Sequence, residues 1–311
     1  MVKKVFITGG AGYIGCTLVP MLLSSGYEVT VYDSLLYGGD GLIHNFSHPN
    51  FNFIKGDILN KEFLHECMKG HNVVVHLAAI VGYAACRMDE QKSYDVNHRG
   101  TINVVSGLEG SQLLLYGSTG SNYGTVDGVC TEETPLNPLS IYGRSKTLGE
   151  EEVMKHTNSV AFRFATAFGV SPRLRLDLLV NDLSYLAHVQ KYIAVYESHF
   201  MRTFIHVKDI ARVFMFAIEN SDDMSNEVYN VGSNSMNFSK GDVCKLIQEK
   251  TDCYVHYADF DGDADKRDYV VSYDKINKLG YDTTVSVEQG IDELLRVFPI
   301  VQMNNKRYKN G

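Results

Sequence analysis

Over roughly the first half of the chain, short apolar runs alternate with longer segments of helical period. Five of these runs read KVFIT, EVTVYD, FNFIKGD, NVVVHLAA and QLLLYGS. They are largely apolar instead of alternating strictly with polar positions, which is typical of strands covered on both faces. Between the first two, CTLVPMLLSSG predicts a helix that ends at Gly26. Repetition of strand and helix in this order predicts an α/β fold with a doubly wound parallel sheet and right-handed crossovers.

The pattern becomes irregular after about residue 165. A helical segment in VSPRLRLDLLVNDLSYLAHVQ is followed by short strands (YIAVY, RTFIHV) and by separated helices. We expect a first domain over residues 1–165 and a smaller C-terminal α/β lobe over 166–300 that binds substrate, with chain exchange between the two. The last residues, 301–311, are mostly polar and predict a loose tail.

Composition narrows the class of protein. The 311 residues carry a net charge of −8 and are 44% hydrophobic. This charge predicts no nucleic-acid partner, because such proteins present a basic face. The longest apolar-rich run, residues 73–86, is too short to cross a bilayer, and the N-terminus does not fit a signal peptide. Six scattered cysteines form no C-x-x-C pair, so we expect reduced thiols, no metal site and a cytoplasmic location.

A glycine-rich turn follows the first strand. In GGAGYIG, the residues Gly9, Gly12 and Gly15 have the spacing at which one glycine makes a tight turn, the next admits a pyrophosphate and the last allows close packing of helix on strand. The following helix offers free N–H groups to phosphates. Such a pattern is weak alone, since glycines often mark only a turn. The expected cofactor contacts here also include Tyr13 and Ile14.

Acidic residues at the ends of the next strands strengthen this interpretation. Asp33 follows Gly15 by 18 residues and ends the second strand, where a carboxylate accepts hydrogen bonds from ribose hydroxyls and repels a 2′-phosphate. The cofactor predicted is therefore NAD and not NADP. Asp57 ends the third strand beside Ile58, and could accept a bond from the adenine amino group.

With these pieces in place, the sequence resembles the extended short-chain dehydrogenase/reductase family, in its nucleotide-sugar epimerase and dehydratase branch. The matching segments run in order along nearly the whole chain and read TGGAGYIG, VYD, GD, HLAA, VNHRGTINV, STGSNYG, YGRSK, RFATAFG, RTFIHVKDIA, YNVGS and DADKRDY. The resemblance implies a Rossmann-type fold, an NAD-dependent enzyme and a homodimer. It also implies that Leu77, Ala78 and Ala79 line the nicotinamide side and that Asn97 braces the central strands at the cofactor site.

The resemblance makes Tyr142 and Lys146 the catalytic pair, although a tyrosine and a lysine four residues apart occur in many helices. A tyrosine has an ordinary pKa near 10 and needs nearby positive charge to act as a base. Lys146, one turn later, and an oxidised nicotinamide would both favour the phenolate. It would then accept the proton of a sugar hydroxyl while a hydride leaves the carbon. The family's third position falls on Thr119, with Ser118 as the alternative one residue away.

The residues after Thr119 bear on the reaction. Sugar-nucleotide 4,6-dehydratases of this family carry Asp-Glu there, whereas this chain has Gly120 and Ser121. Without those carboxylates, elimination of water lacks its proton carriers. We therefore expect oxidation at C4 of a nucleotide-diphosphate sugar, either reversed with inversion, as in a 4-epimerase, or stopped at the ketosugar, as in a 4-dehydrogenase.

The substrate side departs from the galactose epimerase pattern, because Thr166 stands where many members have asparagine. SPRLRLDLLVND and DADKRDY are similar to a subgroup that oxidises C4 of GDP-linked heptoses in bacterial capsular polysaccharide pathways. The alternatives are a UDP- or dTDP-hexose 4-epimerase and, less favoured, a 4,6-dehydratase or a non-catalytic dinucleotide sensor. Guanidinium groups suit a diphosphate, and the substrate contacts expected are Ser118, Thr119, Thr166, Arg173, Arg175, Asn181, Arg202 and Arg267.

Overall fold

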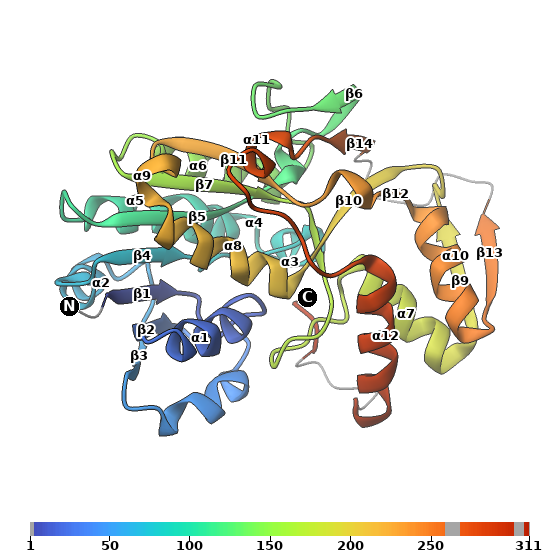
Figure 1. Cartoon of the computed structure of the whole chain (residues 1–311), viewed down its shortest axis with the longest axis horizontal. Helices are drawn as coiled ribbons and strands as arrows, with labels where there is room; N and C mark the ends of the chain where they lie inside the picture. The colour runs from blue at the N-terminus through green and yellow to red at the C-terminus, as the bar shows by residue number, and fades with distance from the viewer. Residues whose placement is uncertain (1–2, 259–267, 302–307, 311) are drawn as a thin grey trace.

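The computed structural model describes residues 3–258, 268–301 and 308–310, and its largest part is a parallel seven-stranded sheet (Figure 1). The strand order is β11-β7-β5-β4-β1-β2-β3, and every neighbouring pair is parallel. The strands are β1 (Lys4–Thr8), β2 (Glu28–Asp33), β3 (Phe51–Lys55), β4 (Val73–His76), β5 (Leu113–Thr119), β7 (Ser159–Phe164) and β11 (Glu227–Val231). This is the expected Rossmann-type order. From β1 the strands are added toward one edge of the sheet, as far as β3, and the chain then returns to place β4 on the other side of β1.

Both faces of this sheet are buried, which explains the apolar runs. Alternate residues of one strand enter different cores: Val5 and Ile7 pack on one face, and Phe6 packs on the other. The first core contains residues of α1 (Gly15–Ser24) and α8 (Val207–Glu219). The second contains residues of the helices α2 (Lys61–Met68), α5 (Gly100–Ser106) and α6 (Ile141–Val153). A sheet with no solvated face has no polar positions to alternate.

Smaller elements surround the sheet. Between the main strands lie the helices α3 (Tyr83–Met88) and α4 (Glu90–Tyr94), the 3₁₀ helices η1 (Asp40–Ser47) and η3 (Gly120–Asn122), and the π-helical turn η2 (Asp95–Arg99). At the top of Figure 1, β6 (Thr125–Cys130) pairs in parallel with β14 (Asp268–Val271). The short helix α9 (Ser221–Met224) precedes β11 in the sequence, and the short helix α11 (Asp274–Asn277) packs against β11.

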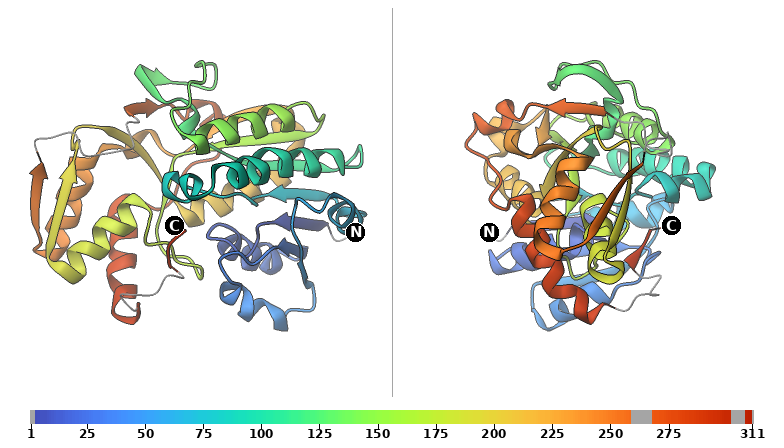
Figure 2. Two further views of the ribbon diagram at one scale, coloured as in Figure 1. Left: turned by 180° about the vertical axis from the view of Figure 1, so that it is seen from behind. Right: turned by 90° about the vertical axis from the view of Figure 1, so that its right-hand side faces the viewer.

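A smaller lobe with a separate hydrophobic core lies beside the sheet (Figures 1 and 2). Its helices are α7 (Leu179–Gln190), α10 (Lys240–Thr251) and α12 (Val287–Val297), followed by the 3₁₀ turn η5 (Phe298–Ile300). The pair β9 (Tyr192–Tyr196) and β13 (Tyr254–Ala258) packs on them, and a three-stranded sheet has the order β12-β10-β8. Those strands are β8 (Thr166–Phe168), β10 (Met201–His206) and β12 (Asn237–Ser239), with the 3₁₀ turn η4 (Asn234–Met236) before β12.

The chain crosses between the lobes more than once. After β10 it returns to the large sheet through α8 and β11. Residues 207–231 therefore belong in space with the Rossmann sheet, although they lie beyond the predicted boundary at residue 165. Residues 308–310 of the predicted loose tail also have defined contacts, because the Leu176 amide donates to the Tyr308 carbonyl at 2.7 Å. Within the described residues, none of the helices combines the length and apolar character needed to cross a bilayer.

Candidate active site

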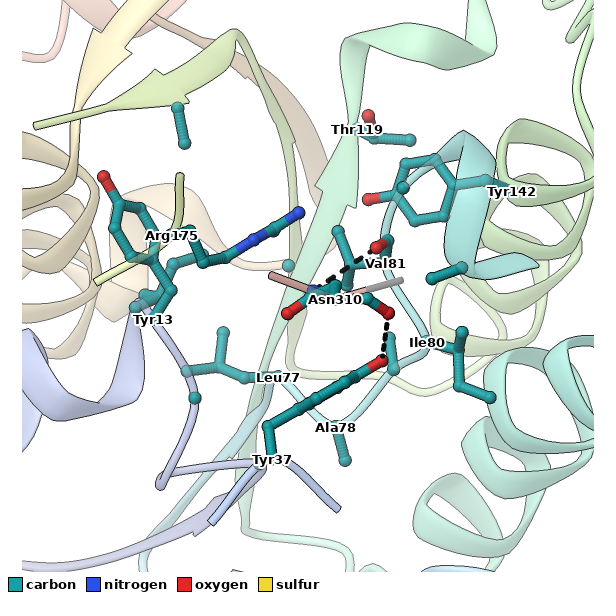
Figure 3. Close-up of a pocket in the computed structure, with 18 of the residues that line it drawn as sticks. Tyr13, Tyr37, Leu77, Ala78, Ile80, Val81, Thr119, Tyr142, Arg175 and Asn310 are labelled. Carbon is teal, nitrogen blue, oxygen red and sulfur yellow. Dashed lines mark hydrogen bonds between the residues drawn. The ribbon is translucent and has the colours of Figure 1, made fainter. Parts of the chain in front are cut away.

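A cavity of about 760 Å³ opens at the carboxyl end of the large sheet, where the smaller lobe meets it. Its walls come from the glycine turn after β1, the loops after β2 and β4, the end of β5, the start of α6 and the segment that leads into α7. Open parallel sheets bind ligands at this edge, at the point where the strand order reverses. Figure 3 shows several of the lining side chains.

The glycine turn fits the close approach of a ligand and of neighbouring backbone. Gly9 has a φ of +72°, and a Cβ atom there would lie 2.5 Å from the Ala78 nitrogen. At Gly15, the first residue of α1, a Cβ atom would lie 2.5 Å from the Gly10 Cα atom. Gly12 has only the Gly9 carbonyl within reach of an added Cβ atom, at 3.1 Å. All three glycines line the cavity, and the first and last also allow close packing of backbone on backbone.

The two predicted aspartates lie at the ends of β2 and β3. The Asp33 carboxylate accepts hydrogen bonds from the Ala11 amide at 3.0 Å and the Leu35 amide at 2.8 Å, which ties the glycine turn to the end of β2. Burial raises the pKa of Asp33, and these two hydrogen bonds oppose the shift. Asp57 accepts from the Leu59 amide at 2.9 Å. Both aspartates and Ile58 line the cavity.

Leu77, Ala78 and Ala79 follow β4 and line the cavity, whereas Asn97 stands behind this wall. The buried Asn97 side chain accepts from the Ile80 amide at 2.7 Å and donates to the Ile80 carbonyl at 2.9 Å. It also donates to the Ser145 hydroxyl on α6 at 3.0 Å. Asn97 therefore fixes the loop after β4 against the helix that carries Tyr142.

Tyr142 and Lys146 lie in the first turns of α6, and both line the cavity. The helix begins where the Ser140 side chain accepts from the Gly143 amide at 3.0 Å. Tyr142 and Thr119 extend toward the same part of the cavity from opposite elements (Figure 3). The structure thus brings together the three residues predicted to be catalytic.

Lys146 is 3% exposed, and its ammonium group lies 3.8 Å from the centre of the Tyr116 ring. Burial lowers the pKa of Lys146 to about 7, an effect that the negative charge of Glu150 opposes. Glu150 itself is buried and forms an ion pair with Arg163, with a shortest distance of 2.7 Å. The site therefore contains a lysine whose charge changes near neutral pH.

The environment of Ser118 and Thr119 separates the two alternatives. Both residues line the cavity, but the Ser118 hydroxyl donates to Glu150 at 2.6 Å and accepts from Asn122 at 3.3 Å, so it is already engaged in a buried network. The Thr119 hydroxyl interacts with Ser121, at 3.1 Å from its hydroxyl and 3.2 Å from its amide. Thr119 is thus the better placed of the two to contact a substrate oxygen.

The predicted substrate residues do not form one cluster. Thr166, Arg173, Arg175 and Arg202 line the cavity, whereas Arg267 lies outside the described residues. Asn181 is fully buried and braces the loop before α7, since it accepts from the Gly169 amide at 2.9 Å and donates to the Arg175 carbonyl at 2.8 Å. The Arg175 guanidinium pairs with the Asp177 carboxylate.

Arg173 differs from the other arginines. Its guanidinium lies 4.9 Å from the centre of the Tyr37 ring, in the loop after β2. Its Nε and Nη2 atoms are buried, and no described residue accepts a hydrogen bond from them. Buried guanidinium donors are costly unless an acceptor reaches them, so this pattern fits an anionic group of a ligand. The same donors fit the pyrophosphate of a dinucleotide in the adjoining glycine turn.

Among the lining residues that the sequence interpretation missed are Tyr37, Lys240, Tyr269 and Asn310. Tyr37 follows Asp33 by four residues, and this proximity was the one signal available. Lys240 is the first residue of α10 and is 4% exposed. Tyr269 and Asn310 come from segments far along the chain. No local pattern marks them as neighbours of Tyr142.

Tyr13 has a structural role in the cavity wall. Its hydroxyl donates to the Gly169 carbonyl at 2.8 Å, and its carbonyl accepts from the Ser171 hydroxyl at 2.7 Å. Burial raises the pKa of Tyr13 far above its ordinary value. Tyr13 therefore remains a neutral donor that joins the glycine turn to the segment before α7.

The Rossmann sheet, the glycine turn and the Tyr142–Lys146 pair together define a dinucleotide-dependent oxidoreductase. The model of the NAD dependent epimerase/dehydratase family matches residues 5–232, and the chain belongs to this family. It is accordingly an NAD-dependent enzyme of the nucleotide-sugar epimerase and dehydratase group, as the sequence predicted.

Relatives that match the chain at nearly full length differ in their reactions. A putative UDP-glucose 4-epimerase of Methanocaldococcus jannaschii is 26% identical, over 97% of this chain and 99% of the relative. A dTDP-glucose 4,6-dehydratase of Actinoplanes sp. is 28% identical, over 93% of this chain and 96% of the relative. The structure of UDP-glucuronic acid 4-epimerase from Bacillus cereus, in complex with UDP-glucuronic acid and NAD, is 25% identical with a TM-score of 0.86, covering 96% and 99% of the two chains.

Proposed function

We propose that this enzyme oxidises C4 of a nucleotide-diphosphate sugar, with NAD as the hydride acceptor. The observation that supports the proposal most is the convergence of Tyr142, Lys146 and Thr119 on one cavity beside the glycine turn. These groups lie on β5 and α6, whereas the glycine turn follows β1. A hydroxyl donor, a proton acceptor and a nearby positive charge are what hydride removal from a secondary alcohol requires.

In this mechanism Tyr142 accepts the proton of the C4 hydroxyl, and Thr119 holds the same oxygen through its side-chain hydroxyl. Bound NAD supplies the electrophilic carbon that takes the hydride. Asn97 holds the loop after β4 in a fixed position relative to helix α6 through its bonds to Ile80 and Ser145. Tyr142 therefore has a fixed position relative to the wall formed by Leu77 and Ala78.

Lys146 adds positive charge that favours the Tyr142 phenolate. Because burial lowers the pKa of Lys146 to about 7, the charged form is lost as the pH rises above that value in the ligand-free enzyme. The Tyr116 ring, 3.8 Å below the ammonium group, and the Glu150 carboxylate favour the charged form. We infer that these two groups keep Lys146 usable at neutral pH.

For the substrate diphosphate we propose Arg175, Arg202 and Lys240, which line the cavity on the side of the smaller lobe. Arg202 and Lys240 are both nearly fully buried beside the Phe200 ring. Buried cations at the mouth between two lobes suit an anionic ligand. Arg173, next to Tyr37, is assigned to the cofactor pyrophosphate instead. Arg267 remains a prediction from the resemblance.

Two products are compatible with this chemistry. The segment SPRLRLDLLVND supports a 4-dehydrogenase acting on a GDP-linked heptose, in a cytoplasmic pathway to capsular polysaccharide. The many relatives named as UDP-glucose 4-epimerases support a hexose 4-epimerase as the second candidate. In either case we propose a homodimer, by analogy with the family.

The test is incubation with GDP-, UDP- and dTDP-sugars while the absorbance of reduced nicotinamide and the products are followed. We expect Tyr142→Phe to lower turnover at least about a hundredfold with little change in sugar-nucleotide affinity, because only the proton acceptor is lost. Tyr254→Phe, at an exposed position on β13, is the matched control. Near-normal turnover in Tyr142→Phe would contradict the mechanism. Absence of turnover with every sugar tested would contradict the substrate class.

A further inference from the structure

The described C-terminal residues, 308–310, lie across the cavity and bind three separate loops. The Leu176 amide, in the segment before α7, donates to the Tyr308 carbonyl at 2.7 Å. The Tyr37 hydroxyl, in the loop after β2, donates to the Asn310 carbonyl at 3.2 Å. The Asn310 side chain donates to the Val81 carbonyl, in the loop after β4, at 3.4 Å. Figure 3 shows Asn310 between Tyr37 and Val81, with Tyr142 beyond.

The positions of these anchors identify what the segment crosses. Tyr37 lies four residues after Asp33, the proposed ribose ligand, and Val81 lies two residues after Ala79 on the proposed nicotinamide side. A dinucleotide bound at this sheet edge runs from the end of β2, past the glycine turn, to the end of β4. Asn310 therefore spans the groove between the two halves of the cofactor.

Two residues that line the same groove, Asn310 and Arg173, have buried polar atoms without a described partner. The Asn310 Oδ1 atom is buried, and no partner for it is found in the described part of the chain. The Arg173 Nε and Nη2 atoms, beside Tyr37, are in the same situation. A buried amide oxygen needs a donor and a buried guanidinium needs an acceptor. A ribose hydroxyl and a pyrophosphate oxygen supply both kinds of partner.

Charge supports the position of the segment. Asp182, on α7, lines the cavity, and burial raises its pKa. The positive charge of Lys309 opposes that shift, which places the lysine within electrostatic reach of the carboxylate. The strap, defined here as residues 308–310, is thus held by one backbone bond at Tyr308 and by two bonds at Asn310.

We propose that this strap closes the NAD groove and that Asn310 is a cofactor-binding residue that keeps NAD bound from one turnover to the next. This inference rests on the proposed function only because it takes the groove beside the glycine turn to be the NAD site. The Asn310 amide oxygen accepts from the cofactor while its amide nitrogen remains bound to Val81. Tyr37 positions the strap through its hydroxyl and stacks its ring against Arg173. Release of NAD requires the strap to detach from both loops.

The test measures dissociation of NADH without any sugar. Bound NADH is displaced by excess NAD, and its fluorescence is followed in the parent chain, in Asn310→Ala, in Tyr37→Phe and in a chain that ends at residue 307. We expect NADH to leave about tenfold faster or more in Asn310→Ala and in the shortened chain, and faster by a smaller factor in Tyr37→Phe. Asn52→Ala, an exposed position on β3, is the matched control and should release NADH at the parent rate.

Each outcome decides the proposal. Unchanged NADH release in Asn310→Ala, with the fold intact by circular dichroism, would overturn it even if the shortened chain does not fold. Unchanged release with a raised KM for the sugar nucleotide would instead assign the strap to the substrate. Because the measurement needs no turnover, an inactive sugar panel with accelerated NADH release would contradict the proposed function and leave the strap standing.

Discussion

At the scale of single residues, Lys146 has two opposed properties. Its charge is useful to Tyr142, yet full burial makes that charge expensive to keep. The pKa of Lys146 is lowered to about 7 from an ordinary value of 10.5. A group whose pKa is lower in the folded than in the unfolded chain destabilises the fold, most strongly below the folded pKa. The penalty decreases as the pH rises toward the unfolded value.

Replacement of Lys146 by methionine should therefore stabilise the NAD-free protein while it abolishes turnover. We expect the free energy of unfolding to rise by about 2 kcal/mol or more at about pH 7, since each pKa unit corresponds to about 1.4 kcal/mol. The gain should be smaller at about pH 9, because removing the proton from Lys146 on folding then costs less free energy. Urea unfolding of both chains at the two pH values measures the difference. A gain in stability that grows with pH would contradict the lowered pKa of Lys146.

The family resemblance predicted Tyr142, Lys146 and Thr119, and the spacing from the glycine turn predicted Asp33. The structure places all four residues at one cavity, and their roles stay predictions. Asn181 was predicted to bind substrate, whereas the structure shows it bracing the segment before α7. Asn97 was expected to brace the central strands, and in the structure it holds the loop after β4. Nor could the sequence show that the Arg173 guanidinium lies beside the Tyr37 ring. These contacts form between loops of different elements, and no spacing along the chain encodes them.

At the scale of elements, the start of helix α1 packs against the glycine turn after β1 through backbone and not through side chains. A Cβ atom on Gly15 would lie 2.5 Å from the Gly10 Cα atom, and backbone cannot move aside as a flexible side chain can. The start of α1 is also the part of the helix that faces the proposed pyrophosphate site. Packing and cofactor binding therefore depend on the same glycine.

We expect Gly15→Ala to lower the free energy of unfolding by about 1–3 kcal/mol and to weaken NADH binding at least about tenfold. Gly110→Ala is the matched control, because a Cβ atom there meets no other atom within 4 Å. That variant should remain within about 0.5 kcal/mol of the parent. Urea unfolding and fluorescence titration with NADH check both expectations. Equal effects of the two substitutions would show that the contact at Gly10 relaxes without cost.

Five strands of the large sheet, β1 to β5, were predictable because each is a largely apolar run bounded by glycine or polar residues. Strands β7 and β11 were not among the predicted strands. The pairs β6–β14 and β9–β13 were not predictable, since their partners are separated by long stretches of chain and their pattern is only partly apolar. Their register depends on the packing of the smaller lobe. Propensity along a short window carries no information about such a distant partner.

At the scale of the whole molecule, the cleft between the two lobes determines which groups can reach a bound sugar. Among the described residues, the carboxylates that line the cavity are Asp33, Asp57, Asp177 and Asp182. The first two stand at the proposed adenosine end. Asp177 is paired with Arg175, and the positive charge of Lys309 acts to lower the pKa of Asp182. Thr119 is followed instead by Gly120 and by Ser121, which lines the cavity and whose amide donates to Thr119.

This arrangement predicts a product that keeps its terminal hydroxyl group. A 4,6-dehydratase must remove a proton from C5 and protonate the leaving hydroxyl at C6, and neither glycine nor serine titrates near neutral pH. A Cβ atom at Gly120 would lie 3.2 Å from the Phe164 carbonyl, so this position leaves little room for a carboxylate side chain. We expect a 4-keto or C4-inverted sugar, identified by NMR of the product from whichever sugar nucleotide is turned over. A methyl doublet of a 6-deoxy sugar would show that another group carries out the elimination and would refute the assignment.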